Sequence, residues 1–117
     1  MSSSSDTPEI TGAPIEIDVV DEAGDRPTLV VRGEIDVSTS PELRAQLGRL
    51  LEHQPSGIVV DLRGVGFVDS SGLGVLVGAL KRLREAGGDD VVLLGVQEPV
   101  RKVFEITGLD RLFRLEG

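Results

Sequence analysis

The most constraining stretch of this sequence runs from residue 58 to residue 83. It opens on Ile58–Leu62, an apolar run with one acid that has the length of a single strand. Phe67–Gly74 follows, and leucine and valine then recur at helical spacing over Leu73–Leu83. A strand that leads directly into a helix predicts a crossover unit of a parallel sheet. The near-continuous apolar run is typical of a central strand that is covered on both faces.

The residues before this stretch predict a hairpin and a helix. Ile15–Val19 alternates apolar and acidic residues, and Leu29–Ile35 forms a second strand after a turn-rich segment, so the two strands should pair antiparallel. A helix is predicted to begin with Ser40 as its N-cap and Pro41 at its first position. This helix stops before Gly57.

The residues after position 83 predict one more crossover from strand to helix to strand. Val91–Leu94 reads as a buried strand, Glu98–Thr107 as a helix that Gly108 ends, and Leu112–Leu115 as a short final strand. The predicted fold is therefore a single α/β domain of order β-β-α-β-α-β-α-β. Its mixed sheet has four to five strands, with the helices packed on it.

Composition excludes several classes of function. The 117 residues carry a net charge of −8, which argues against a nucleic-acid binder, and the absence of cysteine excludes thiol catalysis and disulfides. Residues 1–13 are polar and acidic and predict a disordered tail, and residues 14–117 form the domain. No stretch reads as a secretory signal or a membrane span, so we expect a cytoplasmic protein without direct membrane insertion.

The most reactive-looking segment is Asp69–Gly72, which we considered first as an enzyme site. A serine nucleophile needs a base within hydrogen-bond reach, and the only imidazole, His53, is predicted at the far end of another helix. The segment also lacks the Gly-x-Ser-x-Gly pattern and the Gly-Lys-Ser/Thr of a nucleotide loop. We therefore expect no catalysis, no cofactor and no metal.

Two structural interpretations of the same segment are open. Ser70 or Ser71 can cap the following helix by accepting bonds from its first amides. Gly74 and Gly78 lie four residues apart and form a shallow groove on one helix face. For these glycines, close packing of the helix on the sheet is favoured over ligand binding, and for Gly72 and Gly74 we expect a valine to disturb that approach.

A hydroxyl at a helix N-terminus also tolerates phosphorylation. The free amides and the positive end of the helix dipole stabilise a phosphate, so the domain need not unfold. Phosphorylation of Ser70 would add about −1.5 to −2 charges to one surface patch. Glu34, Asp36 and Asp69 would strengthen the effect if the fold brings them near. A partner docked on this patch would then be expelled.

Four separated blocks, Gly33–Asp36, Ser40–Arg44, Phe67–Gly74 and Val103–Leu109, together resemble the bacterial anti-sigma factor antagonists, which are STAS-domain proteins. The resemblance covers residues 15 to 115 in collinear order. The sequence departs from the family pattern in two places. It carries an extra acidic N-terminal tail, and its C-terminal helix is short or missing.

The resemblance implies a partner switch. The unmodified protein would bind an anti-sigma factor that is also a serine kinase and so free a sigma factor, as a monomer before complex formation. Phosphorylation of Ser70 would abolish binding, and a PP2C-type phosphatase would restore it; the ATP and the catalytic metals belong to these partners. Asp69 would position the loop. The switch loop implied by the resemblance contains Glu34, Asp36, Asp69, Ser71, Gly72, Leu73 and Gly74.

One alternative keeps the fold and changes the role. STAS domains also serve as regulatory or structural subunits of membrane transporters or of larger signalling assemblies. Co-purification with an integral-membrane or scaffold partner, without a kinase, would favour that alternative.

Overall fold

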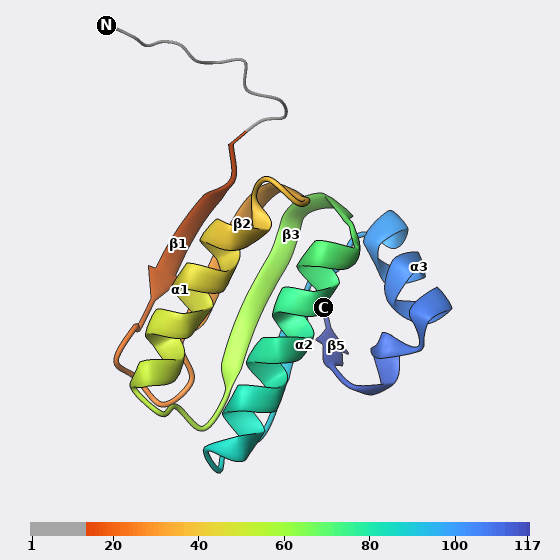
Figure 1. Cartoon of the computed structure of the whole chain (residues 1–117). Helices are drawn as coiled ribbons and strands as arrows, with labels where there is room; N and C mark the ends of the chain where they lie inside the picture. The colour runs from red at the N-terminus through yellow and green to blue at the C-terminus, as the bar shows by residue number, and fades with distance from the viewer. Residues whose placement is uncertain (1–13) are drawn as a thin grey trace, which may run out of the picture.

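A computed structural model describes residues 14–117, and the predicted tail over residues 1–13 lies outside this described part. The described residues form five strands, three α-helices and one short 3-10 helix (Figure 1). In chain order the elements are β1 (Glu16–Val20), β2 (Thr28–Ile35), α1 (Ser40–Glu52), β3 (Ile58–Val68), α2 (Ser70–Glu85), β4 (Val91–Leu94), α3 (Glu98–Thr107), η2 (Leu109–Arg111) and β5 (Arg114–Glu116).

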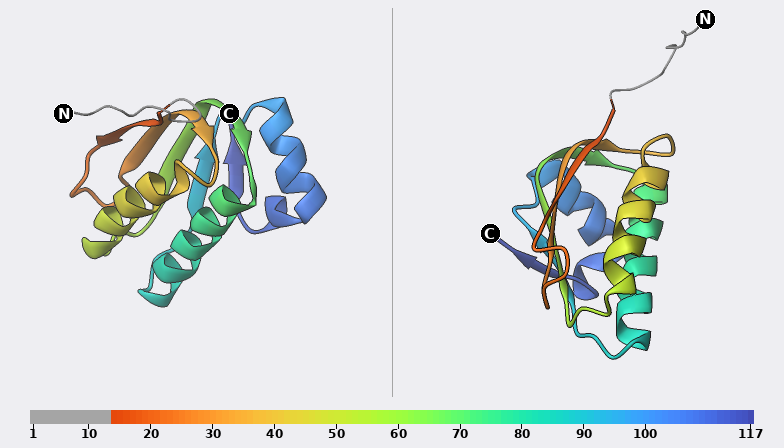
Figure 2. Two further views of the ribbon diagram at one scale, coloured as in Figure 1. Left: turned by 45° about the horizontal axis from the view of Figure 1, so that its top comes forward. Right: turned by 90° about the vertical axis from the view of Figure 1, so that its left-hand side faces the viewer.

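The sheet has the strand order β1-β2-β3-β4-β5. β1 pairs antiparallel with β2, and each later pair is parallel. The predicted hairpin, element order and mixed sheet are therefore confirmed. Every crossover moves one strand further in the same direction, and since such connections are right-handed, the three α-helices lie on one face of the sheet (Figure 2).

The prediction that β3 is covered on both faces is wrong. Ile58 and Val60 face the helices and are fully buried, whereas Val59 points to the other face and is only partly buried. Asp61 lies on that open face, where its carboxylate accepts bonds from Arg63 at 3.0 Å (Nε) and 2.6 Å (Nη2). Arg63 holds the pKa of Asp61 below its usual value. An ion pair, rather than a second layer, thus accommodates the acid of the central strand.

The hydrophobic core lies between the helices and the covered face of the sheet. Phe104 of α3 packs edge-to-face on Phe113, with ring centroids 5.7 Å apart. The largest fully buried side chains are Phe104, Leu29, Ile35, Leu43, Leu47, Leu50, Ile58, Leu62, Leu76, Leu83 and Leu93.

β3 is longer than the sequence pattern predicted and runs to Val68. Its extension contains Gly64, and the pairing register with β2 shifts between Val30 and Arg32 and again between Gly33 and Glu34. Such irregularities add twist and break the simple alternation on which strand prediction depends. The extension pairs Val68 with Ile35, so β2 and β3 end side by side.

Candidate functional site

The candidate site begins where these two strands end. The amide of Asp69 donates to the carbonyl of Ile35 at 3.0 Å, which ties the first residue after β3 to the last residue of β2. Each strand is followed directly by an aspartate, Asp36 or Asp69. Parallel strands end at the same edge of a sheet, and here the charge of Asp36 acts on Asp69 and opposes its ionisation. The sheet therefore brings together two acids that lie far apart in the sequence.

Asp69 is the N-cap of α2. Its Oδ1 accepts the amides of Ser71 at 2.9 Å and Gly72 at 3.2 Å, and the hydroxyl of Ser71 at 2.5 Å. The Ser71 hydroxyl bond is the largest cause of the lowered pKa of Asp69. The expectation that Ser70 or Ser71 caps the helix is wrong, because the carboxylate one residue earlier takes the first amides and leaves the serines inside the helix.

Asp36 organises the turn that leads into α1. Its Oδ1 accepts the amide of Ser38 at 2.9 Å and the hydroxyl of Ser38 at 2.7 Å, and the latter is the main cause of its lowered pKa. Thr39 Oγ1 accepts the amide of Asp36 at 2.9 Å and donates to the carbonyl of Glu34 at 2.7 Å. Thr39, not Ser40, is therefore the residue that precedes the helix as its N-cap.

The two serines differ sharply in their surroundings. Ser70 is the first residue of α2 and is exposed, and its hydroxyl makes no hydrogen bond to residues 14–117. Ser71 is partly buried and donates to Asp69. At this end of the domain, the hydroxyl of Ser70 is therefore free, whereas the hydroxyl of Ser71 is held in a hydrogen bond to Asp69.

Two exposed apolar side chains flank the acids, and the sequence analysis did not single them out as contacts. Val37 follows Asp36 and is 74% exposed, and Phe67, which pairs with Glu34, is 47% exposed. Val37 directly follows Asp36, and Phe67 lies two residues before Asp69, so each is an apolar residue close in sequence to a strand-end acid. Exposed apolar side chains beside a polar rim are typical of protein-binding surfaces.

The remaining residues of the predicted switch loop divide between the core and the surface. Gly72 and Leu73 are buried, and a Cβ on Gly72 would lie 2.5 Å from Ile35 Cγ2 and 3.0 Å from Val68 Cγ1. Gly74 is exposed, and a Cβ there would meet nothing within 4 Å. The expected helix–sheet approach is confirmed for Gly72 and wrong for Gly74, because Gly74 is on the solvent side of α2.

His53 lies away from this edge. It is the C-cap of α1, whose first residue is at the site edge, and its Nε2 is 3.7 Å from Glu22 Oε2. The expected position at the helix end is confirmed. Among residues 14–117 no three histidines, cysteines or acids form a cluster that could hold a metal ion, and no helix there is long and apolar enough to cross a membrane.

Comparison with known proteins identifies the family of the domain. The family model described as the STAS domain matches residues 15–117. The chain belongs to the STAS family. The anti-sigma-B factor antagonist of Staphylococcus aureus is 40% identical over 85 residues, which are 73% of this chain and 78% of the relative. The anti-sigma-B factor antagonist of Listeria monocytogenes is 34% identical over 103 residues, or 88% of this chain and 90% of the relative.

A solved structure extends the likeness to three dimensions. The crystal structure of an anti-sigma factor antagonist from Mycobacterium paratuberculosis is 30% identical, covers 91% of this chain and 90% of that chain, and has a TM-score of 0.78. The resemblance to anti-sigma factor antagonists is thereby confirmed. In this STAS domain, the end of the sheet that carries Asp36, Asp69 and Ser70 also carries the exposed apolar side chains of Val37 and Phe67.

Proposed function

We propose that this STAS domain is an anti-sigma factor antagonist that phosphorylation of Ser70 switches off. The unphosphorylated form binds an anti-sigma factor with serine kinase activity, and the sigma factor is released. A PP2C-type phosphatase reverses the modification. The antagonist itself is regulatory and not an enzyme, and its place of action is the cytoplasm. The relatives named as anti-sigma-B factor antagonists support the general role.

The free hydroxyl of Ser70 is the single observation that carries this proposal. A kinase must bring the hydroxyl in line with the γ-phosphate of ATP, so the hydroxyl has to be exposed and not held by a neighbour. Ser70 is exposed and has no hydrogen-bond partner among residues 14–117, whereas the hydroxyl of Ser71 is held by Asp69. Ser70 is therefore the better acceptor of the two.

The charges at this edge explain how a phosphate would act without unfolding the domain. At the first position of a sixteen-residue helix, the positive end of the helix dipole favours a dianion, although the amides of Ser71 and Gly72 are already held by Asp69. The carboxylates of Asp36 and Asp69 are already on this edge. A phosphate added to them makes a strongly negative patch, which repels an acidic partner surface and costs the desolvation of the phosphate on binding.

The apolar side chains of Val37 and Phe67 supply the attraction in the unmodified state. Their burial by a partner contributes through the hydrophobic effect, at roughly 25 cal/mol for each Å² removed from water. A phosphate on the same edge would have to be buried with them or keep the partner away. The switch therefore needs no conformational change, only a change in the cost of covering one surface.

The test combines modification with binding. The full chain is incubated with its cognate anti-sigma factor kinase and ATP, the product is mapped by mass spectrometry, and binding is followed by calorimetry. We expect one phosphate, on Ser70. Ser70→Ala should remain unmodified and still bind, and Ser70→Asp should weaken binding by about tenfold or more, equivalent to about 1.4 kcal/mol.

Two control variants make the result specific. Ser71→Ala should still be phosphorylated, because Ser71 is not the acceptor. Lys102→Glu changes a charge on α3, away from the site edge and from α1 and α2, and it should leave binding unchanged. Phosphate found on Ser71 instead, or full binding by Ser70→Asp, would exclude the proposed switch.

A further inference from the structure

A groove of about 470 Å³ lies between α1 and α2, on the side of these helices that faces away from the sheet. The two helices pack side by side (Figure 1). Three glycines line the groove, Gly48 from α1 and Gly74 and Gly78 from α2. The apolar residues that line it are Leu47, Leu51, Val75 and Ala79.

The fold does not use the space above the two α2 glycines. A Cβ on Gly74 or Gly78 would meet no atom within 4 Å, and neither residue has a positive φ. Glycine inside a helix costs about 1 kcal/mol relative to alanine. Internal packing therefore gives no reason for either glycine, whereas a groove that admits another backbone at close range does.

Basic side chains line the groove of this acidic protein. Arg44, Lys81 and Arg82 border it, with Glu85 as the single carboxylate. None of the three cations forms an ion pair within residues 14–117, although arginines elsewhere in that range do, for example Arg84 with Asp90. The groove thus carries more positive than negative charge in a chain of net charge −8. Such a surface attracts a negatively charged partner.

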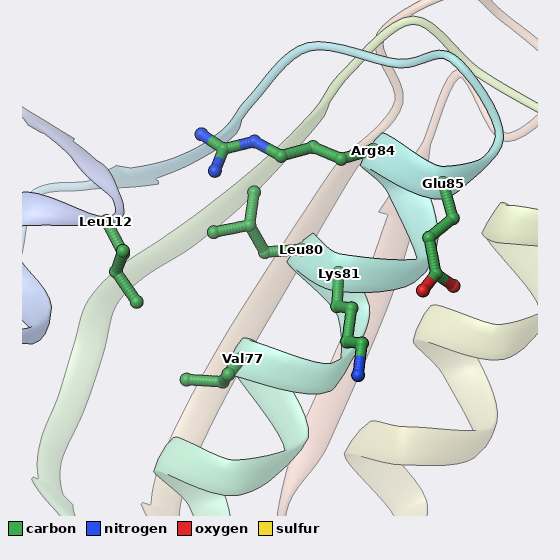
Figure 3. A pocket seen from close by; sticks show the side chains of 6 residues that line it. All are labelled: Val77, Leu80, Lys81, Arg84, Glu85 and Leu112. Atoms are coloured by element: carbon green, nitrogen blue, oxygen red, sulfur yellow. The ribbon is translucent and has the colours of Figure 1, made fainter.

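A second recess, on the opposite side of α2, differs in charge. It has a volume of about 400 Å³ and is bordered by Val77, Leu80 and Leu112. Figure 3 shows these three side chains converging, while Lys81 and Glu85 project on the α1 side of the helix. Arg84 borders this recess but is paired with Asp90, and Lys81 and Glu85, which also border the groove, offset one another here. Nothing about this recess selects a partner, whereas the charge of the α1–α2 groove does.

The groove is continuous with the proposed switch. Ser70, Gly74 and Gly78 are spaced four residues apart, so they share one face of α2. All three are exposed. Ser70 therefore stands one turn before the first glycine of the groove, at its mouth.

We propose that the groove binds an acidic helix of the anti-sigma factor partner. The glycines admit the backbone of that helix, and its carboxylates face the three cations. Leu47 and Val75 are already buried in the domain, so charge and close backbone approach supply the contact. A phosphate on Ser70 then stands at the end of the groove and repels the acidic helix. This inference rests on the proposed function and assigns the part of the partner that senses the phosphate.

The test uses variants of the full chain with the purified cognate kinase. Gly78→Trp fills the groove, and Lys81→Glu with Arg82→Glu reverses its charge. We expect either change to weaken binding by about tenfold or more. Circular dichroism should show that both variants keep the wild-type helix content, and thermal unfolding should show that both stay folded at the temperature of the binding assay. Arg101→Glu with Lys102→Glu, on α3, is the matched charge control and should change affinity by less than about twofold.

The outcomes separate the two proposals. If the wild type is phosphorylated on Ser70 and binds, but the groove variants bind equally well, the groove inference is wrong and the switch stands. If the wild type does not bind the kinase, both proposals fall. Exchange of a partner carboxylate for lysine should restore binding to the charge-reversed variant. A dimer of this chain that Gly78→Trp dissociates would assign the groove to a second copy and overturn the inference.

Discussion

The two faces of helix α2 use the same residue type for opposite purposes. On the sheet side, Gly72 is buried and leaves room for Ile35 and Val68. On the solvent side, Gly74 and Gly78 face open space. The first glycine is required by packing inside the domain, and the other two shape an outer surface. Glycines at neighbouring positions of one helix can therefore be present for different reasons, one for packing inside the domain and another for the shape of its surface.

The two sides of α2 should therefore affect different properties of the protein, stability on the sheet side and partner binding on the solvent side. Changes on the sheet side should alter the free energy of unfolding, since every atom there has a neighbour. Changes on the solvent side should alter partner affinity and leave folding nearly unaffected. Matched substitutions on the two sides of α2 test this division.

Gly72→Val should lower the free energy of unfolding by about 3 kcal/mol, at the upper end of the cost of overpacking a core. The reason is that even the first added carbon would lie 2.5 Å from Ile35 Cγ2, and the branched side chain would displace β2 or α2. Urea unfolding followed by circular dichroism measures the loss.

Gly74→Val is the matched control for this prediction. It adds the same side chain two residues later, where a Cβ meets nothing within 4 Å. Its free energy of unfolding should stay within about 0.5 kcal/mol of the wild type, because valine is slightly better than glycine in a helix. Equal destabilisation by the two variants would show that the division between the faces is wrong.

Asp69→Ala should lower the free energy of unfolding by about 1 kcal/mol, which is the usual cost of losing an N-cap. The variant leaves the amides of Ser71 and Gly72 without their acceptor. Asp69→Asn is the control, since asparagine caps nearly as well as aspartate. Chemical denaturation of the three proteins distinguishes a capping role from a role of the charge itself.

Much of this architecture was predictable, because periodicity and turn residues report on local burial. The hairpin, the three helices and the order of elements along the chain followed from such patterns, and so did the end of α3 at Gly108, which has a φ of 76°. The Asp69–Ser70–Ser71 segment was singled out correctly as a helix start. Most of what the sequence could not reveal depended on contacts across the fold.

One correction is local: the direction of the Asp69 side chain decided which residue caps α2, because Asp69, Ser70 and Ser71 are all favourable capping residues. Two corrections concern contacts across the fold. The open face of the sheet follows from the handedness of three successive crossovers, whereas the apolar run of β3 suggested two covered faces. The role of Gly74 depended on which side of α2 meets the sheet, and two residues along a helix change that side.

The carboxylate of Asp69 should also make the stability of the domain depend on pH. The pKa of Asp69 in the folded state is lowered, mainly by the Ser71 hydroxyl. A lowered folded-state pKa contributes stability above the unfolded value of about 3.9, and this contribution is lost as the pH falls through the folded-state pKa. The wild type should therefore lose stability below about pH 4. The loss should be smaller in Asp69→Asn, with Asp36 and Asp61 supplying the remainder, since their pKa values are lowered too.

The smallest predicted effect has the opposite sign. Gly78→Ala should raise the free energy of unfolding by about 0.5 to 1 kcal/mol, because alanine is the better helix former and its methyl group meets no atom within 4 Å. Thermal unfolding measures the gain, with Gly72→Ala as the contrasting variant that should lose stability. If the solvent-side glycine is retained for an outer contact, this more stable variant should bind its partner less well. A gain in both stability and affinity would instead leave Gly78 with no role that the groove can explain.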